Sequence, residues 1–339
     1  MNMLSINTVL KLNDSKSRLK GIDVLRIICA FLVVCIHCNG YLYKDYIMPL
    51  ARTAVPVFFI ISGYFLYNDV MDVVKKRVLS SIKKISVIFI LSTILYSIYA
   101  LIISINTQQY GVFGNIGLWK LFVFIVNSSP LLFPYDFHLW FLIALIEGDV
   151  FFYLMYNKIS NKILMFVVVS LILLHLNIMI NPIRINIINK VLSVPFRHVL
   201  FQSLPCLIIG YSIAKYKFRL KKKCLLFLLC LLMISSLYEY NSNVENEIMY
   251  STPFLSIIIF ILFKDLLQKY GNNPIYAYMA KMGQDVSLYV YIVHVLVIRC
   301  FNLEHSPFEV FIISIVLSYL YIYAKLFFKK LYNVVMQII

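Results

Sequence analysis

The feature that most constrains this chain is the recurrence of apolar runs long enough to cross a lipid bilayer. A membrane helix needs about 20 consecutive apolar residues, and runs of this kind return from residue 21 to residue 327 with short polar segments between them. Hydrophobic residues make up 62% of the 339 residues and charged residues only 14%, whereas a soluble domain is about half apolar and about a quarter charged. Only helices and closed barrels satisfy their backbone groups in lipid. The sequence therefore predicts an all-α integral membrane protein.

Ten spans are predicted, and they form a single bundle without internal repeats. Their approximate bounds are 21–41, 53–70, 85–105, 137–156, 163–180, 197–214, 224–240, 251–267, 285–302 and 308–327. A further apolar segment, 117–134, is interrupted by polar residues and prolines, and we interpret it as an outer-surface or re-entrant helix. If that segment spans the membrane, the orientation of everything after it changes.

The distribution of charge fixes a predicted orientation. The net charge is +16, but the lysines and arginines form short clusters beside apolar runs, as they do in cytoplasmic loops of membrane proteins; this argues against nucleic acid as a partner. Both chain ends are then expected in the cytoplasm: a basic segment 1–20 without a cleavable signal peptide, a membrane domain 21–330 and a short tail 331–339. All but seven of the 31 basic residues fall on the predicted inner side, and the seven are Lys44, Arg52, Lys120, Arg184, Lys190, Arg197 and Arg299.

The cysteines do not indicate a disulfide framework or a metal centre. Seven cysteines lie within apolar runs, and an odd number there does not suggest paired bridges. Cys35 and Cys38 would share a helix face, but His37 would point about 100° away from Cys38. No metal site is expected.

The first predicted span contains the residues from which a function can be argued. It places Asp23, Arg26 and His37 in an otherwise apolar helix, where charge is costly and calls for a reason. Eleven residues at about 100° each bring His37 to within about 20° of Arg26 on the helix face, about 16 Å further along the axis. Asp23 precedes Arg26 by three residues, so the two can pair. Ala30 and Val33 lie on the stripe between, where small side chains would leave a groove.

Such a groove would suit a long ligand with an anionic head and a reactive far end. Coenzyme A carries phosphates, which arginine can bind bidentately, and its acyl form ends in a thioester. His37 would then lie near the acyl carbon, as a general base or as an acyl-accepting nucleophile. The alternative is that Asp23 and Arg26 anchor the helix end and that His37 makes a polar contact with another span.

Four motifs resemble those of the acyltransferase-3 family of bacterial membrane proteins. They are Asp23-x-x-Arg26-x10-His37, the stretch FFIISGY at 58–64, HLWFL at 138–142 and YVYIVH at 289–294. They occur in the family's order and cover residues 21 to about 300. The resemblance implies a multi-pass protein of the bacterial cytoplasmic membrane that moves an acyl group, expected to be acetyl, from cytoplasmic acyl-CoA to a hydroxyl of an extracytoplasmic polysaccharide or glycolipid. Acyl-CoA would be a co-substrate and not a bound cofactor, and homo-oligomerisation is left open.

The resemblance also implies site residues. Many members carry an arginine just before the third span, where this chain has Lys83 or Lys84, with Arg77 several residues earlier. Lysine would bind a donor phosphate less well than arginine, which puts this part of the donor site in doubt.

The remaining motif residues each have a structural alternative. Ser62 could bind substrate or simply permit close helix packing. His138 and Trp140 would lie at the outer surface, as an acceptor site or as an interfacial pair, and His294 could belong to the site or be a buried structural histidine.

A rival reading is a transporter, because intramembrane Arg, His and Asp also line substrate paths. Another is an assembly partner in which the motif residues only pack.

Overall fold

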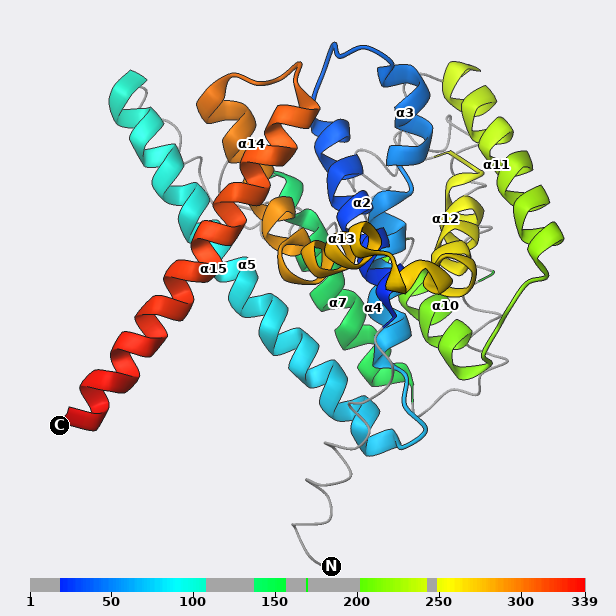
Figure 1. Ribbon diagram of the computed structural model, residues 1–339, viewed down its shortest axis with the longest axis horizontal. Helices are drawn as coiled ribbons and strands as arrows, with labels where there is room; N and C mark the ends of the chain where they lie inside the picture. Colours follow the sequence, from blue (N-terminus) through cyan, green and yellow to red (C-terminus); the bar gives the residue numbers. More distant parts are fainter. Residues whose placement is uncertain (1–18, 108–136, 157–168, 170–201, 243–248, 339) are drawn as a thin grey trace, which may run out of the picture.

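The computed structural model describes residues 19–107, 137–156, 169, 202–242 and 249–338, and within these residues every regular element is helical. The all-α prediction is confirmed for this part of the chain. Figure 1 shows one bundle, with most long helices running between its upper and lower ends. Its elements are α2 (Lys20–His37), α3 (Lys44–Ala51), α4 (Ala54–Leu66), α5 (Met71–Thr107), η2 (Phe137–Leu139), α7 (Trp140–Met155), α10 (Ser203–Lys215), α11 (Lys222–Ser242), α12 (Thr252–Ile261), η4 (Leu262–Leu266), η5 (Leu267–Asn272), α13 (Pro274–Asp285), α14 (Ser287–Phe301) and α15 (Pro307–Ile338).

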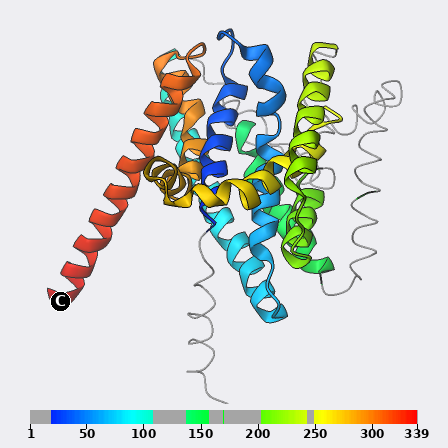
Figure 2. The same cartoon turned by 45° about the vertical axis from the view of Figure 1, so that its right-hand side comes forward.

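The apolar helices are of two kinds. α2 lies in the interior, packed by α3, α4, α13, α14 and α15. By contrast α5, α11 and α15 bury only 22%, 17% and 17% of their most apolar windows, and Figure 2 shows α15 leaving the bundle toward the C-terminus. Long helices that expose Leu, Ile, Phe and Tyr along most of their length are suited to lipid.

The predicted number of spans stays a prediction. Within the described residues, five helices are long and apolar enough to cross a membrane, or six if α13 and α14 form one bent span. Helix α2 contributes a further buried helix of 18 residues. The predicted span 163–180 and the ambiguous segment 117–134 lie outside the described residues.

Two helices lie where the sequence was interpreted as loops. α3 precedes α4 directly, and α13 crosses α2 before the chain turns by 72° into α14. Asn273 caps α13, because its side chain accepts hydrogen bonds from the amides of Ile275 and Tyr276. The expected span 251–267 is also shorter than predicted, since α12 gives way to a π turn and then a 3-10 turn at Leu262 and Leu267.

Two glycines let helices approach closely around the site. A methyl group at Gly63 of α4 would overlap the Leu207 carbonyl of α10, and one at Gly210 would overlap the Ile60 carbonyl of α4. Small residues at such crossings permit close packing of membrane helices. Gly63 therefore accounts for part of the FFIISGY motif by packing, and it fixes the neighbouring Ser62.

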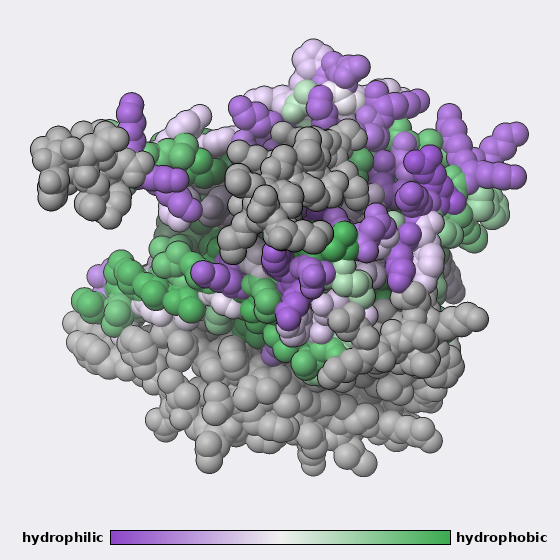
Figure 3. All heavy atoms as spheres, turned by 90° about the horizontal axis from the view of Figure 1, so that it is seen from below, coloured by the Kyte–Doolittle hydropathy of each residue, from purple (hydrophilic) through white to green (hydrophobic). Residues whose placement is uncertain are grey.

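The basic clusters gather at one end of the bundle. In Figure 1 the start of α5 and the end of α10 lie at the lower end, and they carry Lys75, Lys76, Lys83, Lys84 and Lys215. Figure 3 views the molecule from that end, where hydrophilic side chains gather over much of the described surface. This is the arrangement expected of a cytoplasmic face, and we refer to this end as the inner end; the compartment itself remains a prediction.

Candidate functional site

Asp23 and Arg26 form a buried ion pair in the inner half of α2. Arg26 Nη1 lies 2.9 Å from Asp23 Oδ1, and the side chains are 28% and 7% exposed. The guanidinium carbon also lies 5.1 Å from the centre of the Phe65 ring. Gly283 of α13 packs on the Asp23 carbonyl, where any larger residue would overlap it. The carboxylate compensates the arginine charge, and the crossing of α13 fixes both.

Arg26 lines a cavity of ≈ 220 Å³, which we call the inner cavity. Its lining includes Ser62, Lys84, Gln284 and Ser287, together with apolar side chains. Lys84 is exposed to solvent, so the cavity reaches the surface there. Two cations and several neutral hydrogen-bonding groups suit a phosphate-bearing ligand.

The other two residues assigned to donor or substrate binding in this region differ from each other. Ser62 lines the inner cavity, but its hydroxyl donates to the Phe58 carbonyl at 2.9 Å, as serines within helices commonly do. Arg77 does not line the cavity. Its Nη1 donates to the carbonyls of Phe65 and Tyr67, at 3.2 Å and 2.5 Å, and so holds the chain that leaves α4. Arg77 therefore makes a structural contact, and Lys84 is the basic residue of α5 that lines the inner cavity.

Three histidines, from α2, η2 and α14, meet in the outer half of the bundle. The ring centroids are 5.0 Å apart for His37 and His294, 5.1 Å for His138 and His294, and 6.2 Å for His37 and His138. His138 and His294 are 1% and 0% exposed, whereas His37 is half-buried. The described part of the chain contains no group of three His, Cys, Asp or Glu side chains arranged to hold a metal ion. We call His37, His138 and His294 the histidine cluster.

Backbone carbonyls fix the tautomers of the two buried rings. A carbonyl can only accept, so Nε2 of His138 donates to the Ile292 carbonyl at 3.2 Å, and Nδ1 of His294 donates to the Tyr291 carbonyl at 2.7 Å. In the neutral rings the other nitrogens, Nδ1 of His138 and Nε2 of His294, are then acceptors. Both are buried and lack a hydrogen-bond partner among the described residues. Unsatisfied buried polar atoms are uncommon in native structures and call for an explanation such as a ligand or water.

Two tyrosines hold this arrangement from opposite sides. The Tyr291 hydroxyl donates to the His138 carbonyl, and the Tyr96 hydroxyl of α5 donates to the Ile292 carbonyl at 2.8 Å. These bonds tie η2, α5 and α14 together at the histidine cluster. The rings are therefore held by buried backbone contacts and not by flexible loops.

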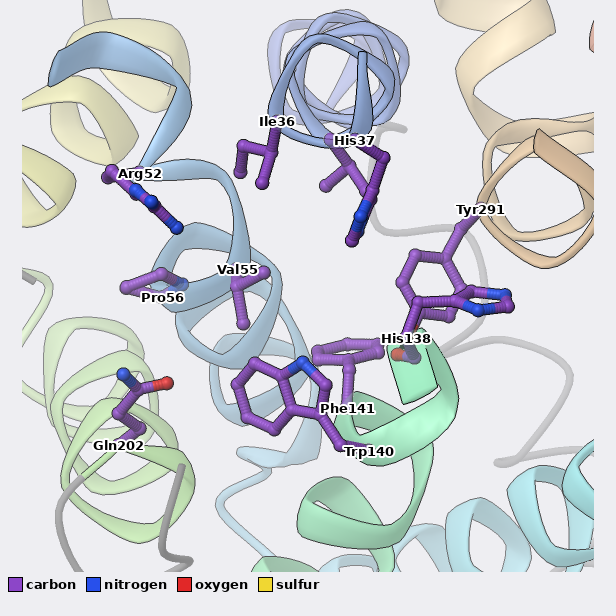
Figure 4. A pocket seen from close by; sticks show the side chains of 11 residues that line it. Ile36, His37, Arg52, Val55, Pro56, His138, Trp140, Phe141, Gln202 and Tyr291 are labelled. Carbon is purple, nitrogen blue, oxygen red and sulfur yellow. Dashed lines mark hydrogen bonds between the residues drawn. The ribbon is translucent and has the colours of Figure 1, made fainter. Parts of the chain in front are cut away.

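His37 and His138 line a second, smaller cavity of ≈ 80 Å³, which we call the outer cavity. In Figure 4 Arg52 and Gln202 border this space on the left and Trp140 borders it from below, with His37 at the top. Its other lining residues are Val33, Ile36, Val55, Pro56, Phe141 and Tyr291.

Two aromatic side chains separate the cavities. Phe141 and Tyr291 line both, and their ring centroids are 5.3 Å apart. Phe141 also packs against Phe58 and Phe59 at 5.8 Å and 4.8 Å. We call this Phe141–Tyr291 pair the partition. It places Arg26 and His37 on opposite sides of one wall.

The expected open groove along α2 is therefore wrong in part. Val33 does line the outer cavity, but Ala30 is 0% exposed and packs in a cluster with Val286, Val290 and Val310. The small side chain at position 30 allows α14 and α15 to approach and leaves no channel. The two cavities instead meet at the partition, whose two residues line both.

Sequence reasoning missed several residues of the site. Phe141 and Tyr291 lie within the HLWFL and YVYIVH motifs, but nothing marked them apart from their neighbours. Arg52 was counted only as an outer basic residue, and Gln202 carried no signal.

The buried Asp149 of α7 accepts a hydrogen bond from Ser81 at 2.6 Å, which ties α5 to α7 away from both cavities.

Comparisons with known proteins are consistent with the motifs. The sequence model of a family described as an acyltransferase domain matches residues 19–328. The chain is 28% identical over 301 residues to a serine/alanine racemase of Enterococcus gallinarum, covering 81% of this chain and 40% of that protein. It is 27% identical over 316 residues to an amino-acid racemase of Enterococcus faecalis, covering 84% and 41%. The chain thus spans about two fifths of the length of these curated relatives. No solved structure matches.

Proposed function

Because the chain belongs to the acyltransferase-3 family, we propose that it transfers an acyl group, expected to be acetyl, from cytoplasmic acyl-CoA to a hydroxyl of an extracytoplasmic polysaccharide or glycolipid. The observation that carries the proposal is the pairing of a cationic inner cavity with a histidine cavity across one aromatic partition. The donor would enter at the basic end and the acceptor from the opposite end, so that no acyl-CoA is needed outside the cell.

The inner cavity would bind the anionic part of the donor. Arg26 is held charged by Asp23, and Lys84 adds a second cation at the mouth. Coulombic attraction to phosphate is stronger in a cavity with low-dielectric walls than in open water. With the phosphates held there, the long arm of the donor would direct its thioester toward the partition.

His37 would perform the chemistry on the far side. As a general base, its imidazole takes the proton of the acceptor hydroxyl while that oxygen attacks the acyl carbon. The new C–O bond forms, the C–S bond breaks, and the proton passes from the imidazolium to the departing thiolate, which leaves as free CoA. His138 and His294 each donate one ring N–H to a carbonyl, and in the neutral ring the remaining nitrogen of each would be an acceptor.

A second route uses His37 as the nucleophile. The imidazole nitrogen attacks the thioester, the C–S bond breaks, and CoA leaves as the thiol with the proton of the ring N–H. The acyl group remains on the ring until the acceptor oxygen displaces it and the hydroxyl proton returns to the imidazole. The partition favours this relay, because donor and acceptor would never need to share one cavity. A rapid release of one CoA per protein molecule in the absence of acceptor would identify the relay. If no CoA is released until the acceptor is also bound, transfer is direct.

The test is a purified preparation in nanodiscs with labelled acetyl-CoA. Wild-type protein should release CoA and label an acceptor, and His37→Ala should do neither. His305→Ala provides a matched control, because His305 is an exposed histidine beside Asn39 and lines neither cavity. The proposal fails if His37→Ala acylates glycan in cells as well as wild type does.

Transport is a second candidate. Two cavities separated by an aromatic partition also suit a solute path with a gate, and the names of the two relatives concern amino acids. A transporter of a small amino acid such as serine would accumulate labelled serine in proteoliposomes and would release no CoA from acetyl-CoA. The same pair of assays therefore separates the two functions.

A further inference from the structure

The side of the outer cavity that faces His37 carries two polar residues that no motif includes. Arg52 follows α3, and Gln202 immediately precedes α10. Figure 4 shows both directed toward the space between Trp140 and His37. A hydroxyl delivered to His37 would have the rest of its molecule against these side chains.

Gln202 presents an unsatisfied acceptor to this space. The residue is only 9% exposed, and its Oε1 has no hydrogen-bond partner among the described residues. It occupies the N-cap position of α10, where side-chain oxygens commonly accept from helix amides, yet its side chain makes no such bond. A buried carbonyl left without a donor destabilises the folded protein. A ligand hydroxyl or N–H would remove that destabilisation.

Arg52 brings a positive charge to the same wall. Its amide bonds to the Met48 carbonyl at 3.0 Å, which continues the last turn of α3 and fixes the position of its backbone. No carboxylate is among the described residues that line the cavity. Asp45 and Tyr240 lie nearby on the outer side. A guanidinium in a half-buried cavity is suited to binding a carboxylate or a phosphate through two parallel hydrogen bonds.

Between these residues and His37 the wall is flat and apolar. Trp140 and Pro56 are among the residues that form it. An indole face gives a large apolar surface for the carbon face of a ring. At ≈ 80 Å³ the cavity can enclose only the reacting end of a larger molecule.

We propose that the outer cavity selects acceptors that carry an anionic group, a carboxylate or a phosphate, close to the hydroxyl that is acylated. Arg52 binds the anion, Gln202 accepts from a neighbouring hydroxyl or N–H, Trp140 supports the ring, and the reacting hydroxyl reaches His37. The inference rests on the proposed acyl transfer and names its acceptor class: an acidic sugar unit.

Three small acceptors test this selection. The probes are methyl β-glucuronide, methyl β-glucoside 6-phosphate and neutral methyl β-glucoside, each offered with labelled acetyl-CoA to the protein in nanodiscs. We expect kcat/KM for at least one anionic probe to exceed that for the neutral glucoside about 10-fold or more, as charge-assisted hydrogen bonds allow. The preferred anionic probe distinguishes carboxylate from phosphate.

Variants assign the preference to residues. Arg52→Gln should slow transfer to the anionic probes far more than transfer to the neutral probe, and so reduce the anionic preference to within about 2-fold. Gln202→Leu should weaken all three probes equally because it removes only an acceptor. Arg299→Gln is the matched control, because Arg299 lies on α14 and lines neither cavity. Its Nη1 lies 3.7 Å from Glu304 Oε1. Equal use of neutral and anionic probes by wild type would overturn the proposal, as would an Arg52→Gln variant that loses all probes alike.

A binding measurement separates this proposal from the proposed function. In the His37→Ala background, methyl β-glucuronide or the 6-phosphate should raise the thermal unfolding temperature, and the added Arg52→Gln change should abolish the rise. If the anionic probes raise the unfolding temperature but the wild-type protein never releases CoA, acyl transfer is refuted and the anion subsite stands. If neither anionic probe binds, the subsite is refuted whatever the turnover.

Discussion

The two cavities of this protein share a wall but differ in size, charge and solvent access. The inner cavity is ≈ 220 Å³, contains two cations and reaches solvent at Lys84. The outer cavity is ≈ 80 Å³ and is bordered by His37 and by His138, whose ring donates to the Ile292 carbonyl. The first is suited to holding a large charged molecule and the second to positioning a small reacting group. Under the proposed function, this difference would divide donor binding and chemistry between the two ends of α2, with Phe141 and Tyr291 as the boundary.

The largest effect is expected from the outer cavity. His37→Ala should reduce acyl transfer by about 10²–10⁴-fold, the usual range for loss of a general acid–base group. Donor affinity should stay within about 2-fold of wild type, because Arg26 and Lys84 lie beyond the partition. Initial rates of CoA release and equilibrium binding of acetyl-CoA to detergent-solubilised protein measure the two quantities. Loss of donor binding in His37→Ala would show that the cavities are not functionally separate.

The complementary change lies in the inner cavity. Arg26→Gln should raise KM for acetyl-CoA by about 10–100-fold, since charge-assisted hydrogen bonds contribute about 1.5–3 kcal/mol. It also leaves the Asp23 carboxylate buried without its arginine, which destabilises the helix contact. Arg26→Lys keeps the charge and serves as the control for folding. If the Asp23–Arg26 pair were purely structural, Arg26→Gln would lower protein yield and thermal stability but leave KM for acetyl-CoA unchanged in the protein that does fold.

These two residues also show how far the sequence reaches. Arg26 and His37 could be placed on one helix face from their spacing alone, and the ion pair with Asp23 followed from the i, i+3 rule. The family resemblance is confirmed over residues 19–328. What could not be predicted is that α14 would pack against Ala30 and close the direct groove, because that depends on the meeting of helices far apart in the chain.

The same limit applies to the residues that complete the site. His138 and His294 were recognised in separate motifs, but their separation of 5.1 Å results from carbonyls of α14 that accept from one ring and fix the other. Gln202 faces the outer cavity only because α4 and α10 approach at Gly63 and Gly210. Periodicity places residues on a helix face, but it does not say which face of another helix will lie opposite.

The partition itself provides a smaller, more specific test. Phe141→Leu should widen the passage between the cavities and shift acyl preference toward longer chains, raising the butyryl-to-acetyl transfer ratio about 10-fold, since one or two methylenes are worth about 1–3 kcal/mol in a pocket. Leucine is preferred to alanine here because complete truncation of a buried phenylalanine costs about 3–5 kcal/mol. Competition between labelled acetyl-CoA and butyryl-CoA gives the ratio directly.

Phe152 offers the matched control for this change. It lies on the same helix, is 1% exposed and packs on Tyr211 with ring centroids 5.0 Å apart, yet it lines neither cavity. Phe152→Leu should cost comparable stability and leave the ratio at its wild-type value. A ratio that shifts equally in both variants would indicate general loosening of α7 and not a boundary at Phe141.

The smallest effect is expected at the mouth of the inner cavity. Lys84 is exposed, and exposed ion pairs contribute only about 0–1 kcal/mol, so Lys84→Ala should raise KM for acetyl-CoA by no more than about 5-fold. Lys84→Arg should lower it by about 2-fold, because a guanidinium can bind a phosphate through two hydrogen bonds where an ammonium acts as a point charge. Lys83→Ala removes the neighbouring charge from a residue that is exposed but does not line the cavity, and it should leave KM unchanged at 0.15 M salt, where the Debye length is about 8 Å. Equal effects at positions 83 and 84 would mean that the basic surface attracts the donor only as a whole, and that the specific contact with it begins at Arg26.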